Sequence, residues 1–217
     1  MRVEIWSDVV CPWCYIGKRR FERALDSFDH AAEVEVEWRS FQLDPSHPKG
    51  VRVPHDESLA RKLGASLDQV REMNARVVAL AAVEGLDYHF ELYQVVNTFD
   101  AHRLTHLAKS MGLGPAAHER LMRAQLVEGA ALDDPATLAR LGAEVGVPEA
   151  EVRRVLASNE FAADVAADIA LARAFGAGGV PFFVIDRRFG VSGAQPVELF
   201  LRALETAHAE AGETPAA

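Results

Sequence analysis

The chain contains only two cysteines, Cys11 and Cys14, with Pro12 and Trp13 between them. Residues three positions apart on a helix share a face, with Cβ atoms about 5–6 Å apart, so the two sulfurs can form a disulfide. In thiol–disulfide exchange one thiolate attacks a disulfide, and a second thiol nearby resolves the mixed disulfide that forms. The residue types and the spacing of the pair therefore favour this chemistry.

The segments on either side of the pair suggest a role for each cysteine. Residues 2–7 alternate apolar and polar side chains, which predicts a strand, and residues 12–28 carry apolar side chains at helical spacing. Cys11 is therefore expected at the N-terminus of a helix, where free N–H groups and the positive end of the helix dipole favour a thiolate. We expect Cys11 to be an accessible nucleophile and Cys14, one turn deeper, to be the resolving thiol. Pro12 suits the first turn because no N–H is needed there.

Two other interpretations of the cysteine pair stay open at this point: half of a structural zinc site, and an inert pair. A structural zinc site commonly has four ligands, whereas the chain has no third cysteine, and the nearest histidine pair is His102 with His106. These histidines lack the glutamate of the HExxH motif and are expected on a polar helix surface. We therefore predict no metal site.

A basic cluster follows the cysteines and contains Lys18, Arg19, Arg20 and Arg23. Its positive potential would help a thiolate. Exposed charges interact weakly, however, so we expect the solvated face of an amphipathic helix.

Strand patterns occur at both ends of the chain. Residues 33–41 alternate and predict a half-buried strand near a sheet edge, and the order strand, helix, strand predicts a βαβ unit. Near the other end, two short strand patterns flank Arg187 and Arg188, which are expected at a hairpin turn. A last helix is expected over residues 196–211.

Helical patterns occupy the middle of the chain. A capping box at residues 66–69 and the pair Asp134 and Pro135 each mark the start of a helix. Further helices are expected over residues 97–111 and 158–175.

These patterns predict how the chain is divided into domains. Neither end has enough strands to be stable alone. We therefore expect one sheet domain formed by residues 1–55 and 177–217, with residues 56–176 inserted as a helical domain.

Composition and charge exclude several classes of protein. The 217 residues are 49% hydrophobic and 25% charged, the balance of a globular protein that needs no metal or disulfide to fold. A net charge of −9 disfavours a nucleic-acid partner. Apolar runs fall short of the roughly 20 residues that span a membrane, and the N-terminal segment lacks a secretory signal pattern. We expect a cytoplasmic protein, where a lone cysteine pair is more typical of catalysis than of a static disulfide.

Four segments together resemble a known family: SDVVCPWCYIG at residues 7–17, NTFDAHR at 97–103, GVP at 179–181 and SGAQ at 192–195. With this pattern the chain resembles the thioredoxin superfamily. It is most similar to the cytoplasmic FrnE-type members of the DsbA-like branch, which are related to 2-hydroxychromene-2-carboxylate isomerases and kappa-class glutathione transferases. The resemblance implies an α/β fold, with a thioredoxin-like sheet domain and a large helical insertion.

The resemblance also implies a substrate-binding backbone. Val180–Pro181 would form a cis peptide beside the cysteines, and the backbone of Val180 would pair with an extended substrate segment. The alternative is a trans proline at the start of an edge strand. Export-compartment DsbA enzymes have a histidine where this chain has Trp13, so we expect a less oxidising couple. Trp13 would form an apolar lip for a substrate, or it would pack under the helical block.

A motif that faces the active-site groove in these relatives includes Asn97 and His102. Asn97 also fits a helix N-cap, and His102 fits an ordinary helix surface. A histidine near the thiols is a candidate base. The candidate substrate-binding residues are Pro12, Trp13, Asn97, His102, Val180 and Pro181.

The expected function is that of a disulfide oxidoreductase, with Cys11 and Cys14 as its catalytic residues. The alternative is a glutathione-dependent isomerase or transferase of the related classes, in which the resemblance implies a non-redox residue in place of Cys11. We expect a redox-active disulfide without a bound cofactor, and glutathione as a candidate co-substrate. The partner would be a protein or small molecule that carries a thiol or disulfide. The direction of exchange and the oligomeric state stay open.

Overall fold

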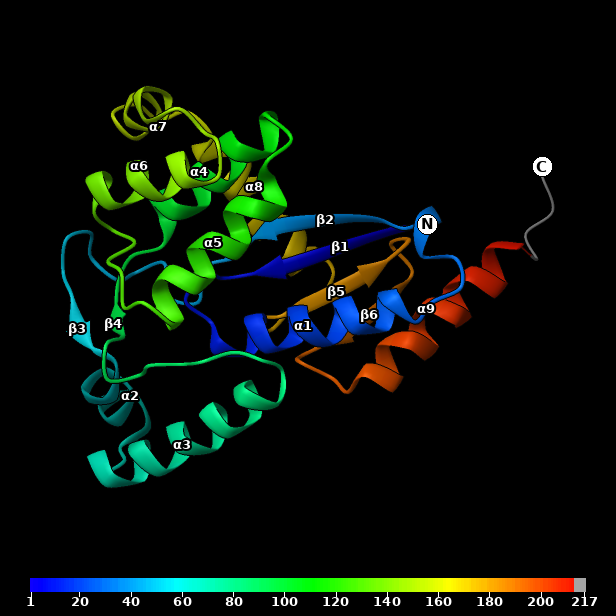
Figure 1. Ribbon diagram of the computed structural model, residues 1–217, viewed down its shortest axis with the longest axis horizontal. Coiled ribbons are helices and arrows are strands. Elements are labelled where there is room, and N and C mark those ends of the chain that lie inside the picture. Colours follow the sequence, from blue (N-terminus) through cyan, green and yellow to red (C-terminus); the bar gives the residue numbers. More distant parts are fainter. Residues whose placement is uncertain (213–217) are drawn as a thin grey trace.

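The computed structural model describes residues 1–212, and within them the main sheet has four strands. Figure 1 shows this sheet at the centre of the molecule. The strands are β1 (Arg2–Ser7), β2 (Glu35–Ser40), β5 (Phe182–Ile185) and β6 (Phe189–Ser192). They lie in the order β2-β1-β5-β6, with β1 and β2 parallel and the other neighbours antiparallel. The predicted βαβ unit and the edge position of the second strand are confirmed.

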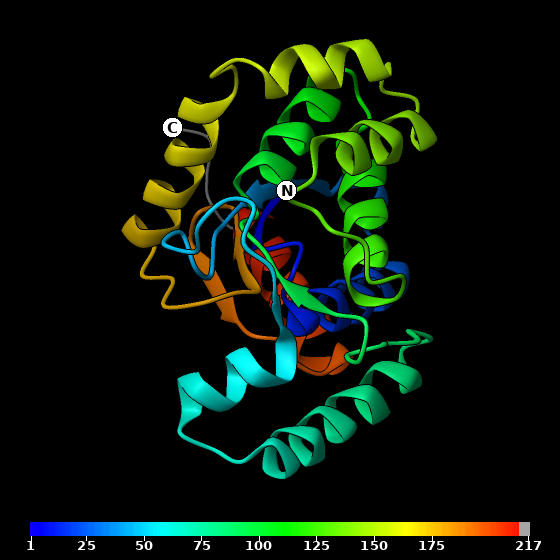
Figure 2. The same ribbon diagram turned by 90° about the vertical axis from the view of Figure 1, so that its left-hand side faces the viewer.

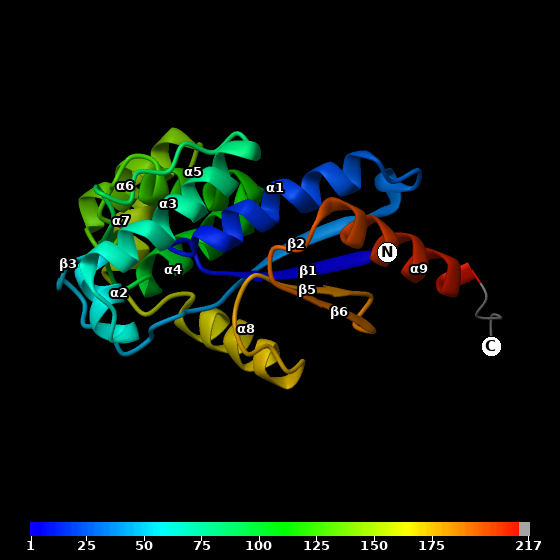
Figure 3. The same cartoon turned by 90° about the horizontal axis from the view of Figure 1, so that it is seen from below.

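Helices cover both faces of the sheet, as Figure 3 shows. On one face lie α1 (Pro12–Asp26) and α9 (Val197–Gly212), and on the other lies α8 (Ala162–Ala174). Side chains alternate along a strand, so Val3 and Ile5 of β1 pack with the core under α1 and α9, whereas Trp6 packs with α8.

A helical block lies between β2 and β5 in the sequence. It begins with a short two-stranded sheet and a helix pair: β3 (Val53–Pro54), α2 (His55–Leu63), α3 (Leu67–Val83) and β4 (Gln94–Val95). It continues with α4 (Phe99–Ser110), α5 (Gly114–Leu126), α6 (Pro135–Glu144) and α7 (Glu149–Leu156) before α8. The β3–β4 pair and the 3₁₀ turn η1 (Ala31–Glu33) were not predicted. Figure 2 shows the start of α1 between the α2–α3 pair and the helices α4 to α7. The division into two domains stays a prediction.

Local sequence signals start and end the elements as expected in several places. Ser66 and Gln69 form the capping box of α3, and Asp134 caps α6 by accepting from the N–H of Thr137. The β5–β6 turn holds Arg187 with φ 56°, and the N–H of Arg188 donates to Ile185 across it. These predictions are confirmed.

Two helices begin later than predicted. Helix α4 starts at Phe99 rather than at residue 97, because the amide oxygen of Asn97 accepts from the N–H of Phe99 and forms a turn before the helix. Helix α8 starts at Ala162 because Phe161 has a left-handed φ of 61°.

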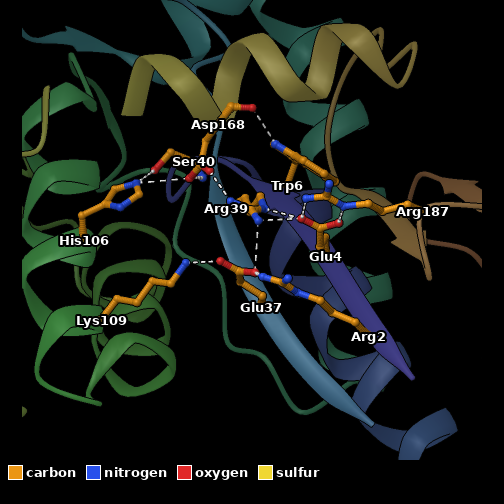
Figure 4. A network of polar contacts seen from close by, with 10 residues as sticks. All are labelled: Arg2, Glu4, Trp6, Glu37, Arg39, Ser40, His106, Lys109, Asp168 and Arg187. Carbon is orange, nitrogen blue, oxygen red and sulfur yellow. Dashed lines mark hydrogen bonds and ion pairs between the residues drawn. The ribbon is translucent and has the colours of Figure 1, made fainter. Parts of the chain in front are cut away.

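A buried polar network joins α8 to the sheet (Figure 4). The Asp168 carboxylate accepts from Arg39 at 2.7 Å and from the N–H of Ser40 at 2.9 Å, and it contacts His106 at 3.1 Å. Its backbone oxygen accepts from the Trp6 indole. Moving α8 away from the sheet would separate these partners and leave a buried charge unpaired, which is costly. The network therefore holds the helical block in one position against β1 and β2.

Among the described helices, none is long and apolar enough to cross a membrane.

Candidate functional site

Cys11 lies at the junction of β1 and α1, as the sequence predicts. It is the N-cap residue of α1, with φ −86° and ψ 114°, and Pro12 follows in the first turn. Both cysteines are free thiols. The structure therefore places the pair at the positive end of a helix dipole.

The sulfurs are less open than expected. Cys11 has 4% of its surface exposed and Cys14 has none, whereas Trp13 between them is 40% exposed. Cys11 is covered because it packs against Val180 and the tyrosines that precede α4. The expectation of an openly accessible Cys11 is therefore wrong in degree, and the greater shielding of Cys14 is confirmed. The exposure of Trp13 favours the apolar lip over packing under the helical block.

Val180–Pro181 is a cis peptide beside the cysteines, so the implied geometry is confirmed and the trans alternative is wrong. The Cys11 thiol donates to the backbone oxygen of Val180, with 3.6 Å between sulfur and oxygen. The Pro181 oxygen accepts from the N–H of Gly193 at 2.8 Å. The structure thus brings Cys11 and this backbone into contact.

Two tyrosines hold the backbone around the cysteines, and the sequence analysis missed both. Tyr93 donates to the backbone oxygen of Val10 at 2.6 Å, and Tyr88 donates to that of Pro12 at 2.7 Å. Burial raises the pKa of each phenol, so both keep the proton that they donate. An aromatic cluster, Tyr88 to Tyr93, was the available sequence signal, but only the fold shows what it contacts.

Two histidines from the helical block hold the end of β1 beneath the cysteines. His102 of α4 contacts the Asp8 carboxylate at 3.3 Å, and His118 of α5 contacts the Ser7 hydroxyl at 3.0 Å. All four residues are buried. The helix-surface alternative for His102 is therefore wrong, because its ring turns inward to Asp8.

Asn97 is also buried, and its side-chain amide donates to the backbone oxygen of His47 at 2.6 Å. It holds the loop after β2 instead of extending into open space. The six candidate substrate-binding residues thus separate into two sets. Pro12, Trp13, Val180 and Pro181 lie around Cys11, whereas Asn97 and His102 are buried, and their role in substrate binding stays a prediction.

The basic cluster on α1 is a solvated face only in part: Arg23 is exposed as predicted, whereas the prediction is wrong for Lys18. Lys18 is buried and pairs with Glu119 of α5 at 2.8 Å and also with Glu22. Burial alone would raise the pKa of Glu119, but hydrogen bonds from Lys18 and Tyr15 outweigh it and lower this pKa to about 2. Because Glu119 lies about one hundred residues away in the sequence, the pattern around Lys18 could not show this ion pair, which joins α1 to the helical block.

The zinc interpretation can be tested by the donor atoms available. Among residues 1–212, one group of three side chains has metal-binding atoms close together: His30, Glu33 and His208. The rings of His30 and His208 stack with centroids 3.8 Å apart, so one ion cannot lie in both ring planes. The cysteines belong to no such group in this described range. Their surroundings therefore do not supply the ligands of a structural zinc site.

Known proteins match the chain over most of its length. A family profile described as DSBA-like thioredoxin domain matches residues 2–205. The solved structure of a probable DsbA oxidoreductase from Streptomyces coelicolor is 45% identical, covers 100% of this chain and 93% of its own, and has a TM-score of 0.96. The protein YwbO of Bacillus subtilis is 28% identical over 161 residues, which are 74% of each chain.

Two more distant solved structures share the fold. The cytosolic disulfide reductase DsbM from Pseudomonas aeruginosa, solved with GSH, is 21% identical and has a TM-score of 0.68, with coverage of 96% of this chain and 100% of its own. A 2-hydroxychromene-2-carboxylate isomerase is 15% identical and has a TM-score of 0.71, with coverage of 98% of both chains. At such identities the similarity is one of fold.

Proposed function

The chain belongs to the family of DSBA-like thioredoxin domains, and we propose that it is a thiol–disulfide oxidoreductase in which Cys11 is the nucleophile and Cys14 the resolving thiol. The observation that carries this proposal is the contact of the Cys11 sulfur with the Val180 oxygen, 3.6 Å away, at the N-terminus of α1. It joins the cysteine pair to a backbone that can bind an extended substrate.

The reaction balances with the two cysteines alone. In the reductive direction the Cys11 thiolate attacks a substrate disulfide, and one substrate sulfur leaves as a thiolate. Cys14 then attacks Cys11 and releases the second substrate sulfur, which leaves a Cys11–Cys14 disulfide. Two electrons pass from the cysteine pair to the substrate. The oxidative direction reverses these steps.

The surface around Cys11 fits a thiol or disulfide carried on an extended segment. The Val180 oxygen accepts a hydrogen bond from the reacting thiol, and such a segment would pair with this backbone as an added strand does. The indole of Trp13 is the exposed apolar group beside it. A substrate would displace the Cys11 thiol from the Val180 oxygen as it binds.

Glutathione is the small thiol that we propose as co-substrate, with the cytoplasm as the working compartment. DsbM, which shares the fold, is named as a cytosolic disulfide reductase and was solved with GSH. A glutathione thiolate would regenerate the reduced pair by attack on the Cys11–Cys14 disulfide, and a second glutathione would complete the reduction.

Single-cysteine variants test the mechanism. Cys14→Ser should accumulate a mixed disulfide on Cys11, visible as a mass increase that dithiothreitol removes. Cys11→Ser should abolish both insulin reduction and oxidation of a dithiol peptide, because no other nucleophilic thiol can replace it. Activity that survives in Cys11→Ser would overturn the mechanism. Turnover of a small aromatic substrate by a variant without both cysteines would instead support the isomerase or transferase alternative.

A further inference from the structure

The second step of the proposed reaction requires an ionised Cys14, yet Cys14 is fully buried. Burial raises the pKa of its thiol, and contact with Cys11 raises it further. Two groups act in the opposite direction, namely the side chain of Ser7 and the backbone N–H of Asp8, which hydrogen bond to the sulfur. The hydrogen-bond donors that favour the Cys14 thiolate therefore lie at the end of β1, at Ser7 and Asp8.

Ser7 has a second partner, which determines where its hydroxyl proton points. Its oxygen lies 3.0 Å from Nε2 of His118. The His118 ring is buried and stacks on Trp38, with centroids 4.2 Å apart and an interplanar angle of 26°. This packing fixes the plane of the ring, so Nε2 stays aimed at Ser7.

The protonation of His118 follows from its surroundings. Burial, with Lys18 and His102 nearby, lowers the pKa of His118 to about 3, so the ring is neutral and carries one N–H. None of the described residues provides a partner for Nδ1. A buried N–H without a partner is rarer and more costly than a bare acceptor. The hydrogen therefore resides on Nε2 and is donated to the Ser7 oxygen.

This tautomer decides what the Ser7 hydroxyl can do. With its oxygen accepting from His118, the hydroxyl donates its own proton, and Cys14 is the thiol whose pKa a hydrogen bond from this hydroxyl lowers. The opposite tautomer would make Ser7 accept from the Cys14 S–H, which would favour the thiol. The geometry thus connects a histidine of α5 to the ionisation of the resolving cysteine.

We propose that His118 is a positioning residue that aims the Ser7 hydroxyl at Cys14, so that this hydroxyl donates a hydrogen bond to the resolving thiolate. The inference deepens the proposed function, on which its catalytic meaning rests. Neither residue touches the substrate. The other ionisable groups that act on Cys14 or His118 are Cys11 at the N-cap of α1, Lys18 on α1, Asp8 after β1, Tyr88 before α4, His102 on α4 and Glu119 on α5.

The ends of β1 and β2 offer a matched control. Ser40 is the register partner of Ser7, and its hydroxyl contacts Nε2 of His106 at 3.1 Å, as Figure 4 shows. This second serine–histidine pair connects the same strand layer to α4, but it contacts Asp168 instead of a cysteine. Its loss should perturb packing to a similar extent without reaching Cys14.

The first experiment measures the Cys14 pKa in a Cys11→Ala background, where Cys14 is the sole thiol, by the ultraviolet absorbance of the thiolate. Ser7→Ala and His118→Leu should each raise this pKa by about one unit, a tenfold lower thiolate fraction at a given pH. The double variant Ser7→Ala/His118→Leu should raise the Cys14 pKa no more than Ser7→Ala alone, because His118 acts through Ser7. His118→Gln should restore the native value, since its amide N–H reaches the same place, and Ser40→Ala and His106→Leu should leave the value unchanged.

The second experiment follows the resolving step with both cysteines present. Reduced protein is mixed with oxidised glutathione, and release of glutathione from the Cys11 mixed disulfide is timed. Ser7→Ala and His118→Leu should slow this release about tenfold while the initial capture by Cys11 keeps its rate. The Cys14 titration does not depend on turnover, so it tests the inference separately from the proposed function. If the variants shift the Cys14 pKa but the protein exchanges no disulfide, the proposed function is rejected and the hydrogen bonds from His118 to Ser7 and from Ser7 to Cys14 are supported. An unchanged Cys14 pKa in Ser7→Ala or in His118→Leu would overturn the inference.

Discussion

Gly17 of α1 lies directly against Pro181, the residue that follows Val180 in the cis peptide. A Cβ atom on Gly17 would be 2.9 Å from Pro181 Cγ, closer than packed carbon atoms approach, and 3.4 Å from the backbone of Ala194. Only a residue without a side chain lets α1 come this near. The distance between helix and proline in turn permits the 3.6 Å contact of Cys11 with the Val180 oxygen.

Gly17→Ala should therefore reduce exchange activity, although alanine is the better helix former by about 1 kcal/mol. The added methyl group must push Pro181 away, at a cost of about 1–3 kcal/mol of stability. We expect a lower urea midpoint and a slower reaction of Cys11 with a disulfide. Gly178→Ala is the matched control, because a Cβ at Gly178 would meet nothing within 4 Å. Equal behaviour of the two variants would contradict this account.

The sequence was sufficient for the parts of the site that local rules determine. The N-cap position of Cys11 follows from a strand pattern that ends just before a helix pattern, and Pro12 in the first turn agrees with it. The capping box of Ser66 and Gln69 follows from a short local motif in the same way. The cis geometry at Pro181 came from family resemblance, because an X–Pro bond alone gives a low expectation of cis.

Contacts between distant segments could not be predicted in this way. The burial of Lys18 depends on Glu119, and the position of His118 against Ser7 depends on how α5 packs over β1. Helical spacing places these residues on a face of their own helix, but it does not say which element covers that face. For the same reason the sequence left two positions open for His102, the active-site groove or the helix surface, while α4 in fact turns it toward Asp8.

Tyr93→Phe should loosen the backbone that leads into Cys11. The phenol is the hydrogen-bond donor to the Val10 oxygen, and its loss leaves a buried carbonyl without this partner, at a cost of about 1–3 kcal/mol. Urea unfolding should show this loss, and hydrogen exchange should show faster opening at the first turn of α1. Tyr15→Phe is the control variant, since the Tyr15 phenol hydrogen bonds to Glu119 and not to the backbone that leads into Cys11. Hydrogen-exchange rates that stay native in Tyr93→Phe would argue against this role.

Asp168→Ala should weaken the attachment of α8 to the sheet. It removes the buried partner of Arg39 and His106, and breaking such a pair typically costs about 3–5 kcal/mol. Guanidinium unfolding should report the loss, whereas Asp164→Ala, at an exposed position of the same helix, should change stability by less than about 0.5 kcal/mol. If both variants unfold at the same guanidinium concentration as the wild type, Asp168 does not hold α8 in place.

Trp13→His should make the cysteine pair more oxidising. A histidine beside the sulfurs can carry positive charge, which stabilises the reduced thiolate form, whereas the exposed indole of Trp13 carries none. Equilibration with glutathione should give the wild type a potential more negative than the about −120 mV of DsbA, and the variant should shift upward by tens of millivolts, with 30 mV equal to about 1.4 kcal/mol. Trp13→Phe should keep the native potential, and an equal shift in both variants would assign the effect to lost packing.

His118 should make stability depend on pH between about 6.5 and 3. Burial lowers its pKa from 6.5 to about 3 in the folded protein, so below pH 6.5 the unfolded chain binds a proton that the folded chain does not. This contribution is complete above pH 6.5 and is lost as the pH falls, by about 1.4 kcal/mol for each pH unit. Between pH 7.5 and pH 5 the wild type should therefore lose about 2 kcal/mol more than His118→Gln, measured by urea unfolding. Carboxylates with lowered pKa values, such as Glu119, act mainly below pH 4.5 and do not obscure this window. Parallel pH profiles for the two proteins would mean that His118 is protonated, or solvated, in the native state.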